Sequence, residues 1–153
     1  MRIEAVLGVL EEIKVIGLGL YLLAVSIYDI KEKTIPILLL IFGGLMAGAE
    51  AVYGVAAGEM AWYQPLLGII PGMGLLLVAW ITEKIGYGDG LVLMLIGGTV
   101  GYQGSLVVLC LGSFFASILC VILLAIRKVK KHSRIPYVPF LAGSYLLYIG
   151  VFV

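Results

Sequence analysis

The sequence predicts an all-α integral membrane protein, a six-helix transmembrane bundle with both chain termini outside. Hydrophobic residues make up 63% of the 153 residues, and charged residues make up only 12%. The charged share is about half that of an ordinary soluble domain. The apolar residues form runs long enough to cross a bilayer, and most charges lie between these runs. We therefore expect one transmembrane domain over residues 1–153, with the lipid bilayer as its surroundings.

Six membrane spans account for the apolar runs. A bilayer core about 30 Å thick needs about 20 helical residues per crossing. Thr34 is expected to cap the second span, with Pro36 in its first turn. The start of the chain lacks the features of a cleavable secretory signal, so we expect the first span to be retained. The first predicted span starts between residues 5 and 11 and ends at residue 28. The second and third cover residues 34–53 and 62–82. The fourth runs from residue 90 to a turn within 97–104, the fifth from that turn to residue 126, and the sixth covers 135–153.

The turn within residues 97–104 is expected because residues 90–126 form a run of 37 residues without a charge. As one straight helix this run would be about 55 Å long, nearly two bilayers. Glycines at 97, 98, 101 and 104 provide the turn chemistry. Pairs of glycines four residues apart also suit close helix packing within the chain or a homodimer face, and we expect internal packing. These pairs are Gly54/Gly58, Gly68/Gly72 and Gly97/Gly101.

The distribution of basic residues predicts the orientation of the bundle. With six spans, eight of the ten Lys and Arg residues fall on one face of the membrane, and only Arg2 and Lys14 fall on the other. The positive-inside rule makes the basic face cytoplasmic. The basic stretch 127–134 is therefore expected to anchor the topology, although such a stretch also attracts anionic lipid or nucleic acid. We expect no nucleic-acid partner.

Metal and cofactor sites are not expected. Cys110 and Cys120 lie ten residues apart, about 15 Å along a helix, which exceeds the roughly 7 Å limit for a disulfide. His132 is the only histidine, and the chain has no CxxC motif. These residues provide too few ligands for zinc or an iron–sulfur cluster.

Two aspartates are the candidate functional residues. Asp89 lies among Gly86, Gly88 and Gly90 at the entrance of the uncharged run. Placing an ionised carboxylate in mid-membrane costs roughly 2.5–3.5 kcal/mol. Such a residue therefore lies at the membrane edge, pairs with another group, or belongs to a functional site. We expect the glycines to adopt backbone conformations closed to other residues and to allow close approach of another chain. Asp29 alone would be an ordinary solvated residue at the end of a span.

The predicted topology brings both aspartates to the same membrane face, on spans that can meet in a small bundle. Two carboxylates about 3 Å apart cannot both ionise easily, so they share a proton. An aspartic protease uses this arrangement, with one carboxylate as base and its partner as acid. Alternatives are a small transporter coupled to a cation or proton, and a scaffold without activity. A transporter needs ionisable groups in mid-membrane, and we expect none in the outer half of the spans.

The same residues resemble the type IV prepilin peptidase family. Residues 86–89, GYGD, match the GxGD signature of intramembrane-type aspartyl proteases. Asp29 followed by a short basic loop and Ile35-Pro36 resembles the family's first aspartate segment, and residues 135–142, IPYVPFLA, resemble its C-terminal Ile-Pro-Phe-Gly-Pro-Phe segment. The resemblance covers nearly the entire chain. Ile37 and Leu91 depart from the family, which commonly has Asn and Lys there.

The resemblance implies an aspartic endopeptidase that removes the N-terminal leader of a prepilin or pseudopilin, with Asp29 and Asp89 as the catalytic residues. It also implies the prokaryotic cytoplasmic (inner) membrane as the location, with the site facing the cytoplasm. N-methyltransferase activity is not expected, because the chain lacks the paired CxxC motifs of larger family members. The residues expected to bind substrate or to shape the site are Gly86, Gly88, Gly90, Pro36, Pro136 and Pro139.

Overall fold

The computed structural model describes residues 2–82, 86–126 and 136–152, and all regular structure in these residues is helical. The stretch 127–134 and Lys84, on which the predicted orientation partly depends, lie outside the described residues. Among the described residues, four helices are long and apolar enough to cross a membrane, and the 15-residue α5 is shorter. The all-helical class is therefore confirmed. The helices are α1 (Arg2–Glu32), α2 (Ile37–Ala56), α3 (Gln64–Thr82), α4 (Tyr87–Ala125) and α5 (Val138–Phe152).

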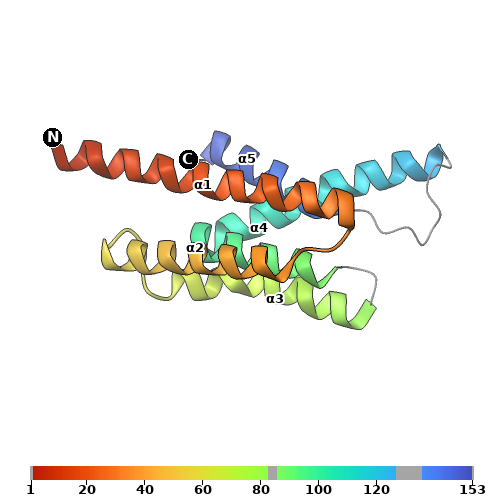
Figure 1. Ribbon diagram of the computed structural model, residues 1–153, viewed down its shortest axis with the longest axis horizontal. Helices are drawn as coiled ribbons and strands as arrows, with labels where there is room; N and C mark the ends of the chain where they lie inside the picture. Colours follow the sequence, from red (N-terminus) through yellow and green to blue (C-terminus); the bar gives the residue numbers. More distant parts are fainter. Residues whose placement is uncertain (1, 83–85, 127–135, 153) are drawn as a thin grey trace.

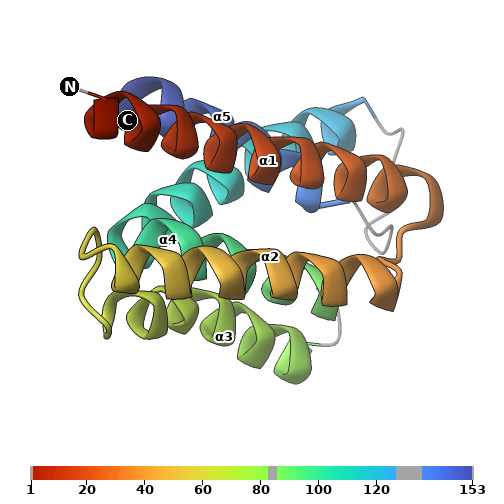
Figure 2. The same ribbon diagram turned by 60° about the vertical axis from the view of Figure 1, so that its left-hand side comes forward.

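The structure thus has five helices in its described residues rather than the six that the sequence predicts. α4 covers both the fourth and the fifth predicted spans, and it is kinked at Gly101, where φ is 75° and ψ is −176°. This backbone conformation is essentially restricted to glycine. Figures 1 and 2 show that the arm after the kink runs back toward the end of the bundle where α4 begins. The turn lies inside the predicted window 97–104, but one glycine makes it without a separating loop.

The helices form two layers (Figures 1 and 2). One layer contains α2, α3 and the first arm of α4, and the other contains α1, α5 and the second arm of α4. α1 ends, and α2, α4 and α5 begin, toward the same end of the bundle. The first turn of α1 and the last turn of α5 lie toward the opposite end.

Glycines allow α3 and α4 to pack closely. In lipid, helices gain little from burying apolar surface, because lipid tails are as apolar as leucine, and close packing becomes important. A Cβ on Gly68 would overlap the backbone carbonyl of Gly97, and a Cβ on Gly97 would overlap that of Gly68. Gly72 lies against Met94 in the same way. Internal packing is therefore confirmed for Gly68, Gly72 and Gly97.

The packing expectation is wrong for Gly58, whereas the backbone of Gly101 lies at the contact with α3, 3.0 Å from a Cβ built on Gly68. At both positions an added Cβ would meet nothing within 4 Å, and both glycines have φ of 75°. Gly58 follows the end of α2, where the N–H of Glu59 donates to the carbonyl of Gly54 at 2.9 Å. This bond satisfies a carbonyl at the helix end. The chain uses these two glycines for their conformation.

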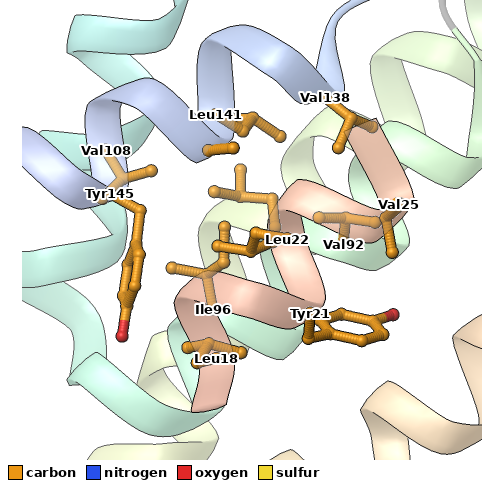
Figure 3. Close-up of a cluster of buried hydrophobic side chains, with 12 residues drawn as sticks. Leu18, Tyr21, Leu22, Val25, Val92, Ile96, Val108, Val138, Leu141 and Tyr145 are labelled. Carbon is orange, nitrogen blue, oxygen red and sulfur yellow. The ribbon is translucent and has the colours of Figure 1, made fainter. Parts of the chain in front are cut away.

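The buried core joins the two layers. Figure 3 shows side chains of α1, α4 and α5 packed together. Leu22 and Val25 of α1 are fully buried, as is Ile96 of α4. α1, the first arm of α4 and the start of α5 are therefore held together close to the end of the bundle where α1 stops. The labelled members of this cluster are Leu18, Tyr21, Leu22, Val25, Val92, Ile96, Val108, Val138, Leu141 and Tyr145.

Two helix starts differ from the prediction. The cap of α2 is Pro36 in an extended conformation, and the Thr34 hydroxyl donates to the carbonyl of Glu32 instead. α1 continues past the predicted end at Tyr28 to Glu32, where Lys33 with φ of 52° follows it. α5 begins three residues later than predicted, because residues 136 and 137 precede the helix.

Candidate active site

Asp29 lies in the last turn of α1, and its side chain is only 6% exposed. Its Oδ2 accepts a hydrogen bond of 3.1 Å from the backbone N–H of Val138, and the backbone of Tyr137 also hydrogen-bonds to this carboxylate. Val138 is the first residue of α5, so its N–H has no partner within that helix. The carboxylate also faces the positive end of the helix dipole. Asp29 therefore ties the end of α1 to the start of α5.

The segment before α5 explains why this donor is available. The carbonyl of Tyr137 accepts hydrogen bonds from the N–H groups of Phe140 and Leu141, so the helix begins after Tyr137. Pro139 has no N–H and tolerates the first turn of a helix. The predicted site-shaping prolines, Pro136 and Pro139, flank the residues that bond to Asp29. Their place in the fold is thus the start of α5.

Asp89 lies in the first turn of α4, and its side chain is only 7% exposed. Its N–H donates to the carbonyl of Gly86 at 3.1 Å, which closes the turn at the start of the helix. A carboxylate in the first turn is favoured by the helix dipole. Asp89 is close enough to Asp29 for their charges to interact. The structure therefore buries the two aspartates that the sequence selects within range of each other's charge.

Tyr137 connects this pair to the second arm of α4. Its hydroxyl and that of Ser113 form a hydrogen bond of 2.8 Å. Burial raises the pKa of the Tyr137 hydroxyl, and the nearby charge of Asp89 raises it further, while the bond to Ser113 lowers it. Either hydroxyl can be the donor in the bond between Tyr137 and Ser113. Sequence analysis missed Ser113, because no motif or spacing distinguishes it from the other serines of an apolar run.

The three glycines around Asp89 do not use left-handed backbone. Among the described residues, the glycines with positive φ are Gly58 and Gly101. Gly86, the cap of α4, has φ of −68° and ψ of 132°, an ordinary extended conformation. The expectation that Gly86, Gly88 and Gly90 adopt conformations closed to other residues is therefore wrong.

The space at these glycines is taken up by neighbours from the same chain, so close approach of another chain stays a prediction. A Cβ at Gly86 would lie 3.2 Å from Oδ2 of Asp89 itself. A Cβ at Gly90 would lie 2.6 Å from Cγ of Leu76, because α3 packs directly against this turn. Gly88 lies against the connection between α1 and α2. Each glycine thus makes room for a different neighbour.

Pro36 lies in that connection. As the cap of α2 it provides the carbonyl that accepts hydrogen bonds from the N–H groups of Leu39 and Leu40. α2 begins toward the end of the bundle at which α1 stops (Figure 1). Pro36 therefore sets where the chain turns back after Asp29.

A second ionisable cluster lies toward the other end of α2, where sequence analysis expected none. Glu50 is half-buried within α2, about 20 Å along the helix from its start, and its charge interacts with that of Lys14. The Lys14 Nζ lies 3.1 Å from a carboxylate oxygen of Glu59 and 4.1 Å from the ring centroid of Tyr53. The sequence does not single out Glu50, because a lone acid within an apolar run belongs to no motif. Its partner Lys14 comes from a distant part of the sequence.

The described residues contain no group of three or more His, Cys, Asp or Glu side chains that could hold a metal ion. Cys110 and Cys120 are both free.

Fold and site together define the class: a helical protein with several candidate membrane spans and two buried, interacting carboxylates toward one end of the bundle. The model of the type IV leader peptidase family matches residues 16–126, a stretch that contains both aspartates. The chain belongs to the type IV leader peptidase family.

Two curated relatives are similar to this chain. The prepilin leader peptidase/N-methyltransferase of Pseudomonas aeruginosa is 30% identical, over 79% of this chain and 43% of the relative. The protein of the same name from Stutzerimonas stutzeri is 28% identical over the same shares. The chain therefore spans less than half the length of these relatives. No solved structure matches it.

Proposed function

We propose that this chain is an aspartic endopeptidase that removes the N-terminal leader of type IV prepilins or pseudopilins, with Asp29 and Asp89 as its acid/base pair. The observation that carries the proposal is that two buried carboxylates, from α1 and α4, lie close enough for their charges to interact. Family membership and the names of the two relatives support the substrate class. In this proposal residues 1–153 act as a single transmembrane peptidase domain, and methyl transfer is not included.

In the proposed reaction the two carboxyl groups hold one proton between them. The ionised carboxylate takes a proton from water as the water oxygen bonds to the carbonyl carbon of the scissile peptide, and the protonated carboxyl gives its proton to the carbonyl oxygen. The C–N bond of the resulting diol then breaks. The leaving nitrogen takes a proton from the first carboxyl, and a diol hydroxyl returns a proton to the second. Both carboxyl groups end in their starting states.

The proposal puts the pair at the cytoplasmic face of the inner membrane. Lys31 and Lys33 are exposed beside the end of α1 that carries Asp29, in accord with the positive-inside rule. The first turn of α1 and the last turn of α5 lie toward the other end of the bundle, which supports termini outside (Figure 1). A prepilin leader in the cytoplasm would then reach the pair at the membrane border. The mechanism needs no second copy of the chain.

The decisive experiment co-expresses the protein with a candidate prepilin and follows leader removal by immunoblot and by mass spectrometry of the product. Asp29→Asn and Asp89→Asn should each lower the cleavage rate by about 10²–10⁴-fold, the usual contribution of a general acid or base. Glu50→Gln is the matched control, since Glu50 is a half-buried acid toward the other end of the bundle. Cleavage at the unmodified rate by either Asn variant would refute the acid/base pair.

A second candidate function is transport of a proton or cation, which the interior position of Glu50 favours. The charge of Glu50 interacts with that of Lys14, however, and a half-buried carboxylate near a lysine fits a structural charge cluster as well as a transport path. Proteoliposomes with a pH-sensitive dye distinguish the two functions. The peptidase proposal expects no proton uptake above that of protein-free vesicles. Uptake that depends on Glu50 and both aspartates, without prepilin cleavage, would support the transporter.

A further inference from the structure

Ile35 packs directly against Gly88. A Cβ built on Gly88 would lie 2.6 Å from Cδ1 of Ile35, 3.1 Å from its Cγ1 and 3.4 Å from its Cβ. Three carbon atoms of one side chain therefore cover the position where any other residue at 88 would carry its Cβ. The space that Gly88 leaves open is filled by Ile35.

Ile35 is held on its other side as well. It lies in the connection between α1 and α2, it is half-buried, and it packs against the buried core cluster described above. Its β-branched side chain has restricted freedom at χ1, so Cβ and Cγ1 cannot easily turn away from Gly88. The contact is thus a stiff spacer between the connection and the first turn of α4.

The two segments joined by this contact are the ones that carry the aspartates. Asp29 lies in the last turn of α1, just before the connection that contains Ile35, and Asp89 directly follows Gly88. The hydrogen bond from Val138 ties Asp29 to α5, and the bond from Asp89 to Gly86 stays within its own turn. The Ile35 contact, in contrast, links the end of α1 to the start of α4.

We propose that Ile35 is a positioning residue that sets the separation of the Asp29 and Asp89 carboxylates by packing into the space left open by Gly88. This inference rests on the proposed peptidase function. Sharing of one proton and joint action on one water both require a defined distance between the carboxylates. A side chain at position 88 would push the start of α4 away from the connection and open that distance.

The first test is a compensating pair of substitutions in the full chain, with prepilin cleavage as the assay. Gly88→Ala should lower kcat by about 100-fold, the loss that a displacement of about 1 Å can produce. Ile35→Val removes Cδ1, the atom nearest the added methyl group, and keeps the branched Cβ. Adding Ile35→Val to Gly88→Ala should restore kcat by roughly tenfold or more toward the unmodified rate. Gly98→Ala is the control, because Gly98 is in the same helix and a Cβ there meets nothing within 4 Å.

The pH profile of kcat separates positioning from loss of folded protein, because both lower the apparent kcat with KM unchanged. Gly88→Ala should lower kcat and leave KM nearly unchanged, since the prepilin contacts away from the reacting bond are intact. The pH profile of kcat should also change, because the two apparent titrations belong to the coupled pair and depend on the distance between its members. Ile35→Val in the Gly88→Ala background should return the profile to its original shape. Loss of folded protein would reduce the rate without moving the profile.

The second test measures the contact without using activity. In a background with Cys110→Ser and Cys120→Ser, the pair Ile35→Cys and Gly88→Cys should form a disulfide on mild oxidation. Their Cβ atoms would be 3.4 Å apart, close to the 3.5–4.5 Å typical of disulfides. Disappearance of both thiols, counted with a mass-tagging maleimide, reports the bond. Ile35→Cys with Gly98→Cys is the matched pair that should stay reduced.

The outcomes separate the two levels of the proposal. Two results, each with cleavage by the unmodified protein, would overturn the role of Ile35 alone. One is that Gly88→Ala is as active as Gly98→Ala. The other is that Ile35→Val does not restore the activity of Gly88→Ala. Failure of the cysteine pair at 35 and 88 to oxidise would also overturn it. Absence of prepilin cleavage by the unmodified protein, with the disulfide still formed, would overturn the proposed function and the positioning role with it.

Discussion

The Asp29 carboxylate accepts hydrogen bonds from N–H groups at the start of α5, although Asp29 itself lies in the last turn of α1. An acidic residue at a helix C-terminus is unfavourable toward the dipole of that helix. The first turn of α5 provides the positive end of its helix dipole and the N–H of Val138, which has no partner within α5 and donates to Asp29. The local cost at the end of α1 is thus offset by a contact across the bundle. The sequence segment that resembles the family's C-terminal motif therefore has a structural reason to lie beside the first aspartate.

The bond between Tyr137 and Ser113 offers a test of how firmly this arrangement is fixed. Hydrogen bonds between membrane helices contribute about 0.6 kcal/mol on average. Tyr137→Phe and Ser113→Ala should each lower the free energy of unfolding in detergent by about this amount, and the double variant should lose no more than either single one. Chemical or thermal unfolding followed by circular dichroism provides the measurement.

Ser117→Ala is the control for this cycle, because the Ser117 hydroxyl donates to the Ser113 carbonyl of the same helix. Its combination with Tyr137→Phe should be additive, since the two hydroxyls make separate bonds. Additive losses in the Tyr137/Ser113 pair would mean that the bond contributes nothing to stability. In that case the start of α5 is fixed by the core and by Asp29 alone.

At the scale of elements, one residue of α4 reverses the direction of the chain without a loop. Its two arms, residues 87–100 and 102–125, join at Gly101. A Cβ at Gly101 would meet nothing within 4 Å, so the requirement for glycine here is conformational. The first arm carries Asp89, and the second carries Ser113, which bonds to the start of α5. The kink therefore returns the chain to the end of the bundle that holds the aspartates.

Gly101→Ala isolates this conformational requirement. Backbone restricted to glycine costs of the order of 1–3 kcal/mol for another residue, so this variant should unfold at a clearly lower temperature in detergent. Gly98→Ala is the matched control, because position 98 has the same open space and an ordinary helical backbone. Alanine is favoured over glycine in a helix by about 1 kcal/mol, so the control should be neutral or stabilising. Equal thermal stability of the two variants would contradict the strained turn.

The sequence predicts some features of the elements well and others poorly, for physical reasons. Charge and hydrophobicity identify the end of α3 at Thr82 and the uncharged run of α4, because a bilayer imposes them. Glycine spacing locates the turn at Gly101 but cannot tell a kink from a loop. The cap of α2 was misjudged, because the Thr34 hydroxyl bonds to the preceding helix instead of to the following one.

At the scale of the whole molecule, the location of Asp29 and Asp89 toward one end of the bundle (Figure 1) could be predicted because it follows from counting spans. Each crossing reverses the chain, so residues before and after a hairpin of two spans return to one end. The neighbours of the pair could not be predicted, because they depend on which faces meet. Ser113 reaches Tyr137, and Ile35 covers Gly88, through contacts that no spacing in the sequence encodes. Motifs therefore identify the candidate residues, and tertiary packing determines what holds them.

The orientation of the whole bundle yields the last prediction. α2 has 20 residues and is about 30 Å long, enough to separate its two ends by a bilayer core. In a background with Cys110→Ser and Cys120→Ser, Lys31→Cys and Trp62→Cys report the two ends, and both positions are exposed. A membrane-impermeant maleimide should label position 31 only in inside-out vesicles and position 62 only in right-side-out vesicles. Labelling of both from one side would contradict the membrane-spanning bundle. Labelling of position 31 in right-side-out vesicles and of position 62 in inside-out vesicles would support a membrane-spanning bundle of the opposite orientation. The aspartates would then lie at the outer face, out of reach of a leader in the cytoplasm.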